Sequence, residues 1–467
     1  MAIEEQNFSM RILVRGPQIC LNPRMNSPTS PTAVDLLLHP DWIIPIEPAG
    51  ITLVDHALVI DDGKILDLLP YPEATRRYQP QEVQHLPGQV MLPGLINAHT
   101  HAATNLLRGY ADDMPLMSWL RDRIWPAETR CLSPDFVRAG TLLACAEMLR
   151  GGITTFNDMY FFPDAAIDAI RQSGMRAALG LPVLEFATPY ASDADDYLSK
   201  GLATRDASKD DPLLSFCLAP HAPYTVSDRS FEKIAMLAAQ LEIPIHTHVH
   251  ETRSEIDESV RQYGMRPIER LRQLGLLGPQ LIAVHAVHLT DAEIDLLGHH
   301  GCHIAHCPTS NLKLGSGIAP LEKLHARGVN VGLGTDSAAS NNRLDLLQEI
   351  RHAALLAKGV SEDASIFSAH AALAAATLGG ARALGLDDRI GSLRPGKAAD
   401  LCAVRLDDWL LQPCFDPASH LVYAAGREHV THTWVAGKLR QKDGTPLAID
   451  LTRLLAEVRL WQARLAA

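Results

Sequence analysis

The sequence has no Cys-x-x-Cys motif, although eight cysteines are spread along its 467 residues, at positions 20, 131, 145, 217, 302, 307, 402 and 414. Scattered cysteines are typical of a reduced intracellular chain and argue against a disulfide framework. The chain also lacks an apolar run of membrane-spanning length, and its acidic start, residues 1–5, lacks the basic region of a signal peptide. We therefore expect a cytoplasmic protein without a membrane partner.

Basic clusters are missing as well. With 42 Lys and Arg against 54 Asp and Glu, the formal net charge is −12, which repels polyanions and argues against a nucleic-acid partner. A small molecule is the default ligand, and the sequence allows a homo-oligomer. A chain of this length with 47% hydrophobic residues can bury a large core, and it is too long for one ordinary domain unless that domain is a barrel. We expect a barrel together with a smaller domain.

Short strand-like segments occur at both ends of the chain. Between residues 33 and 92 they include the runs 34–38 and 42–45 and a hairpin signal, Asp61-Asp62-Gly63, between two apolar runs. A matching pattern returns in 400–404 and 430–435. The predicted parts of the chain are a flexible N-terminal segment (1–32), a β-sandwich part (33–92), a barrel (93–392), the second sandwich part (393–447) and a C-terminal helix (448–467).

The centre of the chain alternates strand-like and helix-like segments. The predicted strands are 92–101, 154–159, 177–185, 214–221, 244–250, 281–288, 302–307 and 329–336. The predicted helices are 134–150, 228–241, 251–274, 292–297 and 343–357. This alternation favours an α/β fold, a distorted (β/α)8 TIM barrel accompanied by a small β-sandwich domain built from both chain ends.

Polar side chains gather at the predicted carboxyl ends of these strands, the face on which a barrel carries its site. They are His99, His101, His221, His246, His248, His250, Glu251, His285, His288, His306 and Asp336. Because a strand alternates its faces, His99 and His101 point the same way. Three histidines and one aspartate form a recognised zinc coordination, for which iron can substitute. The alternatives are satisfied core histidines and, for Asp336, a helix N-cap.

At this point the residues resemble a known family, the amidohydrolase superfamily, and within it the 5′-methylthioadenosine/S-adenosylhomocysteine deaminases, a branch shared with triazine and N-ethylammeline chlorohydrolases. The resemblance covers roughly residues 33–445. It rests on the motifs PGLINAHTH (93–101), HTHVHE (246–251), HCPTSN (306–311), GTDSAASNN (334–342) and GSLRPGKAAD (391–400).

The resemblance implies a role for each matching residue. The implied metal ligands are His99, His101, His248 and Asp336; spacing alone does not choose His248 over His246 and His250. Glu251 and His285 are implied to flank the attacking water, with Asp336 as the base. The implied substrate-binding residues are Trp119 (purine), Glu128 (ribose), His221, Glu251 and Asp336. Without the resemblance, core packing for Trp119 and a solvated helix face for Glu128 would be the preferred interpretations.

The implied activity is that of a metal-dependent hydrolase acting on the C–N bond of a cyclic amidine. A metal-activated hydroxide would remove the 6-amino group of adenosine-type nucleosides, with 5′-methylthioadenosine preferred and S-adenosylhomocysteine and adenosine also accepted. We expect one divalent metal per chain, Zn²⁺ in preference to Fe²⁺. The fourth strand ends in His221 and offers no lysine for a two-metal bridge, so only Glu185 could hold a second ion.

Two other functions are open at this stage. A guanine, cytosine or triazine aminohydrolase or chlorohydrolase of the same branch would keep the metal set and have no need of a ribose-binding carboxylate such as Glu128. A metal-free scaffold protein should have lost ligands, and none is lost here.

The sequence also indicates which 5′ substituent the substrate-binding site would accept. The segment 185–211 carries seven acids against three bases, which disfavours the carboxylate tail of S-adenosylhomocysteine, although Arg205 alone could bind it. Tyr160, Phe161 and Phe162 could form an apolar lip for a thiomethyl group. An ordinary solvated loop and core aromatics are the alternative interpretation.

Overall fold

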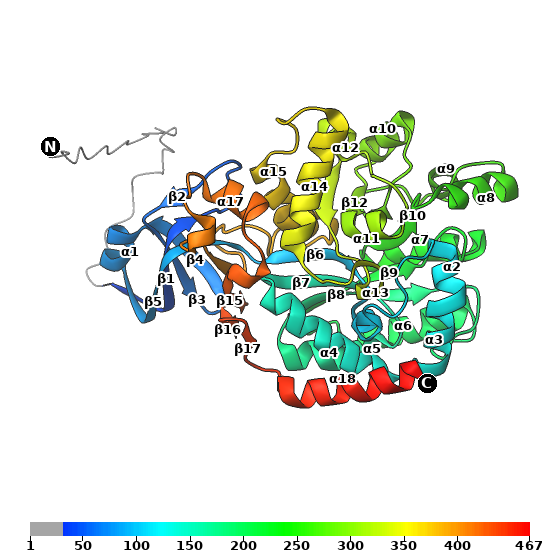
Figure 1. Ribbon diagram of the computed structural model, residues 1–467, viewed down its shortest axis with the longest axis horizontal. Coiled ribbons are helices and arrows are strands. Elements are labelled where there is room, and N and C mark those ends of the chain that lie inside the picture. The colour runs from blue at the N-terminus through cyan, green and yellow to red at the C-terminus, as the bar shows by residue number, and fades with distance from the viewer. Residues whose placement is uncertain (1–30) are drawn as a thin grey trace, which may run out of the picture.

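The computed structural model describes residues 31–467, which form two sheets with their surrounding helices (Figure 1). The predicted flexible segment 1–32 lies outside the described residues except for its last two. In Figure 1 the sheet formed by both chain ends lies beside a larger body of strands and helices.

The larger body is a barrel of eight parallel strands that are hydrogen-bonded in sequence order. They are β6 (Leu95–Thr100), β7 (Ile153–Met159), β8 (Arg176–Val183), β9 (Leu214–Pro220), β10 (Ile245–Val249), β11 (Leu281–His285), β12 (His303–His306) and β13 (Asn330–Leu333). Each falls within or overlaps one predicted strand, so the predicted barrel is confirmed. Beyond the end of β13, the backbone N–H of Asp336 donates to the carbonyl of His99 (3.0 Å), which ties the last strand to the first.

Helices and short turns surround these strands. They are η1 (Ala102–Leu107), α2 (Leu116–Trp119), η2 (Leu120–Ile124), α3 (Trp125–Cys131), α4 (Pro134–Arg150), α5 (Pro163–Ser173), α6 (Ala194–Ser208), α7 (Asp228–Leu241), α8 (Arg253–Tyr263), α9 (Pro267–Gln273), α10 (Asp291–His299), α11 (Pro308–Lys313), α12 (Leu321–Ala326), α13 (Ala338–Asn341), α14 (Leu346–Ser361), α15 (Ala369–Ala374), η3 (Ala375–Gly379) and α16 (Gly380–Ala383). Because helices cover the outside of the barrel, a strand such as β8 is buried along its whole length.

The helix predicted over residues 251–274 is wrong, because it is two helices. Helix α8 ends at Gly264, whose φ of 71° is left-handed, and α9 begins at Pro267. A glycine in the left-handed region ends a helix, and a proline is favoured in the first turn of the next one. The continuous polar and apolar pattern across this break hides the interruption from a search for periodicity.

The smaller domain is built from both chain ends, as predicted, and its strands form one nine-stranded sheet. Its strands are β1 (Thr32–Ile43), β2 (Leu53–Val54), β3 (His56–Asp61), β4 (Lys64–Pro70), β5 (Tyr78–Pro93), β14 (Leu401–Arg405), β15 (Val430–Val435), β16 (Lys438–Lys442) and β17 (Thr445–Pro446). The predicted hairpin joins β3 and β4, and the two short runs predicted at 34–38 and 42–45 are one strand, β1.

The pairing of β14 with β5, where Leu401 lies opposite Pro93, joins the two ends of the chain. An isolated β-bridge pairs Lys64, at the start of β4, with Ala398, just before β14. The outer strand β4 therefore lies next to the segment that leads into the middle of the sheet, and the sheet folds back on itself. Its inner face packs side chains from both ends into one hydrophobic cluster that includes Leu38, Met91 and Trp434. The short helices of this region are α1 (Tyr71–Arg77), η4 (Trp409–Leu411), α17 (Pro417–Tyr423) and η5 (Arg427–His429).

Specific contacts hold the remaining pieces to the barrel. At the start of β8, Arg176 Nε donates to Asp400 Oδ2 (2.8 Å) in a buried ion pair that reaches β14. The C-terminal helix α18 (Leu451–Ala466) lies along α4, where the rings of Phe136 and Trp461 are 5.3 Å apart. In Figure 1 this helix runs along the lower edge of the barrel and leads away from the sheet that precedes it.

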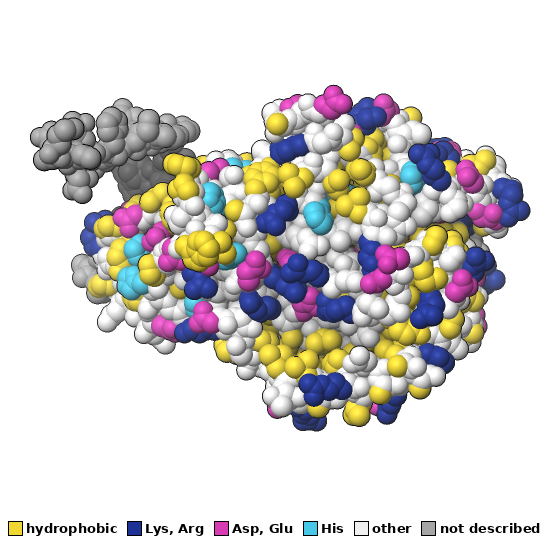
Figure 2. All heavy atoms as spheres, viewed as in Figure 1, with side chains coloured by type: hydrophobic (Ala, Val, Ile, Leu, Met, Phe, Trp, Pro, Cys, Tyr) yellow, Lys and Arg dark blue, Asp and Glu magenta, His cyan; other side chains and the backbone are white. Residues whose placement is uncertain are grey.

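On the face shown in Figure 2, positive and negative side chains are interspersed, with hydrophobic side chains between them. Within residues 31–467, no helix has the length and apolar character needed to cross a membrane.

Candidate active site

The four predicted metal ligands converge at the carboxyl ends of the barrel strands. His99 Nε2 and His101 Nε2 lie 3.2 and 3.3 Å from Asp336 Oδ1. His248 Nε2 lies 3.3 Å from His99 Nε2. The strands β6, β10 and β13 therefore bring side chains that are far apart in sequence to one point. Two groups of candidate ligands each have their ligand atoms within 4.8 Å of one another: His99, His101 and His248 form the first, and His99, His285 and Asp336 form the second.

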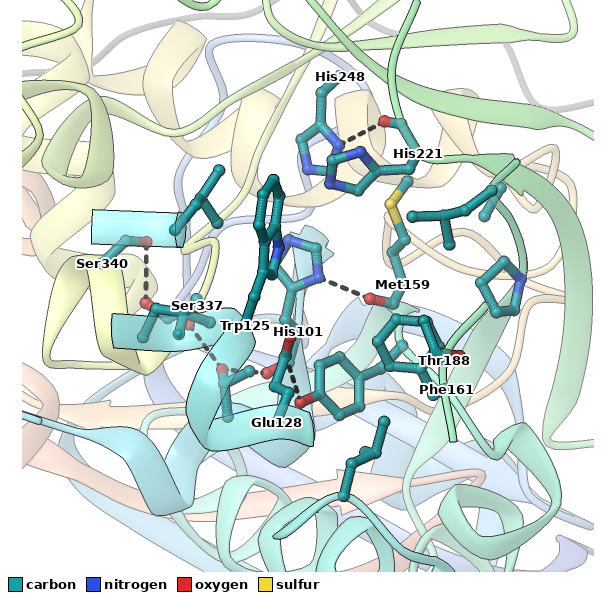
Figure 3. A pocket seen from close by; sticks show the side chains of 18 of the residues that line it. His101, Trp125, Glu128, Met159, Phe161, Thr188, His221, His248, Ser337 and Ser340 are labelled. Carbon is teal, nitrogen blue, oxygen red and sulfur yellow. Dashed lines mark hydrogen bonds between the residues drawn. The ribbon is translucent and has the colours of Figure 1, made fainter. Parts of the chain in front are cut away.

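Hydrogen bonds at the far side of His101 and His248 direct the Nε2 atom of each ring toward the cluster. His101 Nδ1 bonds to the carbonyl of Met159 and His248 Nδ1 to the carbonyl of His221, each at 2.6 Å (Figure 3). Because a carbonyl only accepts, both Nδ1 atoms carry the proton and both Nε2 lone pairs face the cluster. Three imidazole nitrogens and one carboxylate oxygen are a donor set that zinc-like ions prefer. The residues present fit a divalent metal.

The structure also separates His248 from its two neighbours on the same strand. His246 lies behind the cluster, with Nε2 3.0 Å from His99 Nδ1. His250 has a left-handed backbone, with φ of 56°, and its Nε2 accepts the N–H of Ile268 (3.3 Å). Of the three, only His248 presents a free ring nitrogen to the cluster, a distinction that alternation along a strand could not make.

Asp336 is held by two hydroxyls. Its Oδ2 accepts hydrogen bonds from Ser310 Oγ (2.6 Å) and Ser340 Oγ (2.8 Å), which leaves Oδ1 to the histidines. Burial raises the pKa of Asp336, but the hydrogen bond from His99 and the neighbouring imidazoles outweigh it and hold this pKa well below the ordinary value. The N-cap of α13 is Ser337, so the alternative interpretation of Asp336 as that cap is wrong.

Glu251 and His285 form the second half of the cluster. Ser316 Oγ donates to Glu251 Oε1 (3.3 Å), and Glu251 Oε2 lies 3.8 Å from His285 Nε2. Burial raises the pKa of Glu251 above its ordinary value, which favours the protonated, donating form. His285 Nδ1 lies 2.9 Å from Asn311 Oδ1, and this contact orients the ring so that Nε2 faces Glu251.

A cavity of about 520 Å³ opens in front of these residues (Figure 3). Its polar lining includes His101, Glu128, His221, His248, Glu251, His285 and Asp336, and its apolar lining includes Leu116, Trp119, Leu120, Ile124, Trp125, Tyr160, Phe161, Leu184 and Phe186. His221 Nδ1 lies 3.0 Å from Thr225 Oγ1, and burial lowers the pKa of His221 to about 3, so this ring faces the cavity uncharged.

Glu128 and Trp119 belong to the segment α2–η2–α3 over the cavity. Tyr160 Oη donates to Glu128 Oε1 (2.7 Å). Burial raises the pKa of Glu128 to about 7, although this hydrogen bond lowers it. Trp119 is buried and lines the cavity, and its Nε1 has no hydrogen-bond partner among the described residues. The interpretation of Glu128 as part of a solvated helix face is therefore wrong.

The residues expected near the 5′ substituent are only partly in place. Tyr160 and Phe161 line the cavity, whereas the ring of Phe162 lies 5.1 Å from that of Tyr190 and does not. Arg205 pairs with Asp206 on α6 (2.8 Å), away from the lining. Between residues 31 and 467, no lysine or arginine lines this cavity.

Several lining residues had no prediction from the sequence, among them two aromatic residues. Trp125 and Phe186 lie with their rings 6.2 Å apart, on α3 and after β8. The position of Trp125, one helical turn before Glu128, was the available signal. Glu185, the candidate for a second metal, instead accepts the backbone N–H of Ser227 (2.9 Å), and it is in neither group of candidate ligands found in the described part of the chain.

Comparison with known proteins identifies the family of the chain. The model of the Amidohydrolase family matches residues 90–440. The chain belongs to this family. Membership, together with the deaminase names of its relatives, makes it a hydrolytic enzyme.

This amidohydrolase is 45% identical over 439 residues to a 5-methylthioadenosine/S-adenosylhomocysteine deaminase of Teredinibacter turnerae, covering 94% of this chain and 99% of the relative. A crystal structure of an adenosine deaminase from Xanthomonas campestris with bound zinc superposes with a TM-score of 0.92 at 47% identity, covering 94% and 100% of the two chains. A zinc complex of an atrazine chlorohydrolase from Arthrobacter aurescens has a TM-score of 0.84 at 26% identity, with coverages of 91% and 100%.

Proposed function

We propose that this amidohydrolase removes the 6-amino group of adenosine-type nucleosides, with 5′-methylthioadenosine preferred and S-adenosylhomocysteine and adenosine also accepted. The observation that carries the proposal is one cavity that joins the His and Asp cluster to the hydrogen-bonded pair Glu128–Tyr160. The cluster suits hydrolysis at C6, and the carboxylate suits the ribose hydroxyls. The names of the relatives agree with this substrate class.

His99, His101, His248 and Asp336 would hold one divalent ion, which we propose to be Zn²⁺, with Fe²⁺ as the alternative. When bound, such an ion lowers the pKa of a water that it holds to roughly 7 and so supplies the nucleophile at neutral pH. With such an ion bound, Asp336 would accept a proton from the attacking water and pass it to the departing amino group, which would leave as ammonia.

Protonated Glu251 gives its proton to N1 of the purine, so that the ring does not accumulate negative charge while oxygen bonds to C6. His285 Nε2 lies 3.8 Å from Glu251, close enough to take the hydroxyl proton left on C6 and restore Glu251. The product is the 6-oxo purine. His221 and Trp119, which line the same cavity, would orient the base.

Changing Glu128 to glutamine should raise KM for nucleosides, because a charged acceptor of ribose hydroxyls is lost. A hydrogen bond to a charged group contributes about 1.5–3 kcal/mol, so kcat/KM should fall about 10- to 100-fold. Any free base that the enzyme accepts should be hardly affected. Equal losses on nucleosides and free bases would show that Glu128 is structural.

The same residue predicts a pH dependence. Because burial raises the pKa of Glu128 to about 7, the carboxyl takes up a proton as the pH falls through that value and loses its charge. We expect kcat/KM for nucleosides to fall on the acid side of pH 7 in the wild type. The Glu128→Gln variant should lack this limb of the profile.

A panel of 5′-methylthioadenosine, S-adenosylhomocysteine, adenosine, guanine and cytosine tests the proposed function. Since the described cavity lining offers no cation, the carboxylate of S-adenosylhomocysteine should have no ionic partner, whereas a thiomethyl group fits the apolar wall. An unmatched polar group costs about 1–3 kcal/mol, so kcat/KM should favour 5′-methylthioadenosine by about 10-fold or more. A preference for S-adenosylhomocysteine that Arg205→Ala abolishes would contradict this.

Free-base and triazine hydrolysis are the competing functions, and faster turnover of guanine, cytosine or a triazine than of any nucleoside would establish one of them. Glu128 is the residue that favours the nucleosides. The cytoplasmic location and the homo-oligomer stay predictions; the seven cysteines that the structure describes, all of them unpaired, agree with a reduced compartment.

A further inference from the structure

The turn that places Glu251 in the cavity is held by hydrogen bonds to a side chain, because its backbone leaves the sheet. Strand β10 ends at Val249, and the next residue, His250, has a left-handed φ of 56°. The N–H groups of His250 and Glu251 therefore leave the sheet, where no neighbouring strand can accept them. Buried N–H groups need an acceptor, because leaving one unpaired costs about 1–3 kcal/mol.

Glu255 supplies both acceptors. Its Oε1 accepts the N–H of His250 (3.0 Å) and its Oε2 accepts the N–H of Glu251 (2.9 Å). This side chain comes from the first turn of α8 and is only 8% exposed. Each carboxylate oxygen serves one of two consecutive N–H groups, so the carboxylate fixes the direction of the peptide plane between them.

The other side of the turn is also held. The carbonyl of His250 accepts the N–H groups of Val287 and His288, both at 3.0 Å. Thr252 Oγ1 accepts the N–H of Glu255 (3.3 Å), which caps α8 and points the Glu255 side chain back over the turn. Glu251 is thus the residue of the turn whose side chain faces the cavity, where it contacts Ser316 and lies beside His285.

We infer that Glu255 is a positioning residue for the proton donor: through the backbone N–H of Glu251 it sets where the Glu251 carboxyl lies relative to the substrate. Glu255 does not line the cavity and touches no reacting atom. The inference rests on the proposed function, in which Glu251 delivers a proton to N1. Misplacing a reacting group by about 1 Å costs on the order of 100-fold in rate, so the support of this turn has a measurable consequence.

The alternative is that Glu255 only stabilises the start of α8. The two roles differ in what a substitution changes. Loss of a helix support lowers the melting temperature and leaves the turnover of the folded enzyme intact. Loss of a positioning contact lowers kcat while KM and the metal content stay the same.

The test is Glu255→Gln, which keeps the shape of the side chain but turns an NH₂ donor toward one of the two N–H groups. We expect kcat on 5′-methylthioadenosine to fall about 10- to 100-fold, KM to change less than about 3-fold, and the metal content per chain to equal that of the wild type. Glu255→Asp keeps the charge but is one methylene too short to reach both N–H groups. It should show the same fall in kcat with an unchanged KM and metal content, and it serves as the test if the glutamine variant does not fold.

The matched control is Asp345→Asn, which removes the same charge from a buried carboxylate that caps α14 (Asp345 Oδ1 to Gln348 N, 3.3 Å) and lies outside the cavity. It should keep the wild-type kcat. If both Glu255 variants lower the melting temperature with kcat unchanged, or if both lose metal, the inference is overturned. A wild-type enzyme that deaminates no nucleoside would instead overturn the proposed function, so the two failures are distinguishable.

Discussion

Replacing Glu251 with glutamine should lower kcat by about 10² to 10⁴, the usual contribution of a general acid. A carboxamide at this position can still accept the hydrogen bond from Ser316 Oγ but cannot give a proton to N1 of the purine. The metal should stay bound, because Glu251 is in neither group of candidate ligands that the described residues contain. Steady-state kinetics with metal analysis of the same preparation measures both quantities.

Ser316→Ala is the companion variant. It removes one hydroxyl donor from Glu251 Oε1 and leaves the carboxyl in place, so kcat should fall far less than in Glu251→Gln. If Glu251→Gln lost its metal together with its activity, Glu251 would be a ligand, and the proton transfer to N1 would need another donor.

Removing the metal should abolish turnover, and one equivalent of Zn²⁺ per chain should restore it. The purified protein should carry close to one divalent ion per chain, since His99, His101, His248 and Asp336 surround a single point. His248→Ala should lower the metal content, because it removes one of the three imidazole nitrogens. Elemental analysis of the dialysed protein measures the occupancy.

His221→Ala is the control for that experiment. This imidazole lines the same cavity but is in neither group of candidate ligands within residues 31–467, so the variant should keep its metal while turnover falls. Two tightly held ions per chain, with the second lost in Glu185→Gln, would contradict a single-metal site.

The barrel could be predicted from the sequence because its physical signals are local. Parallel strands covered on both faces appear as apolar runs, and polar side chains such as His99 and Asp336 appear where those runs end. Capped helices are equally visible: α4 begins at Pro134 after the N-cap Ser133, as the pattern predicts. Local sequence signals were thus enough to predict the strands, most of the helices and the end of the barrel that carries the site.

Other features of the site depend on packing between distant segments, and the local sequence gives no signal for them. The roles of His246 and His250 differ because the backbone turns after β10, and alternation along a strand treats them alike. Arg205 was a candidate for substrate binding by charge, and only the packing of α6 shows that it pairs with Asp206. The roles of the metal ligands came from family motifs, since spacing did not choose among the three histidines of β10.

The pairing of β5 with β14 has a consequence for synthesis of the chain. Strands β1–β5 emerge from the ribosome first, but the edge of β5 that faces β14 must wait for roughly 300 further residues, which at about 5–20 residues per second takes about 15–60 s. During that time an unpaired strand edge is open to wrong partners. The barrel can fold in the interval, because its eight strands pair in sequence order as each one is made. Closing the smaller domain is therefore the late step of folding, and a chain truncated before β14 would expose this edge permanently.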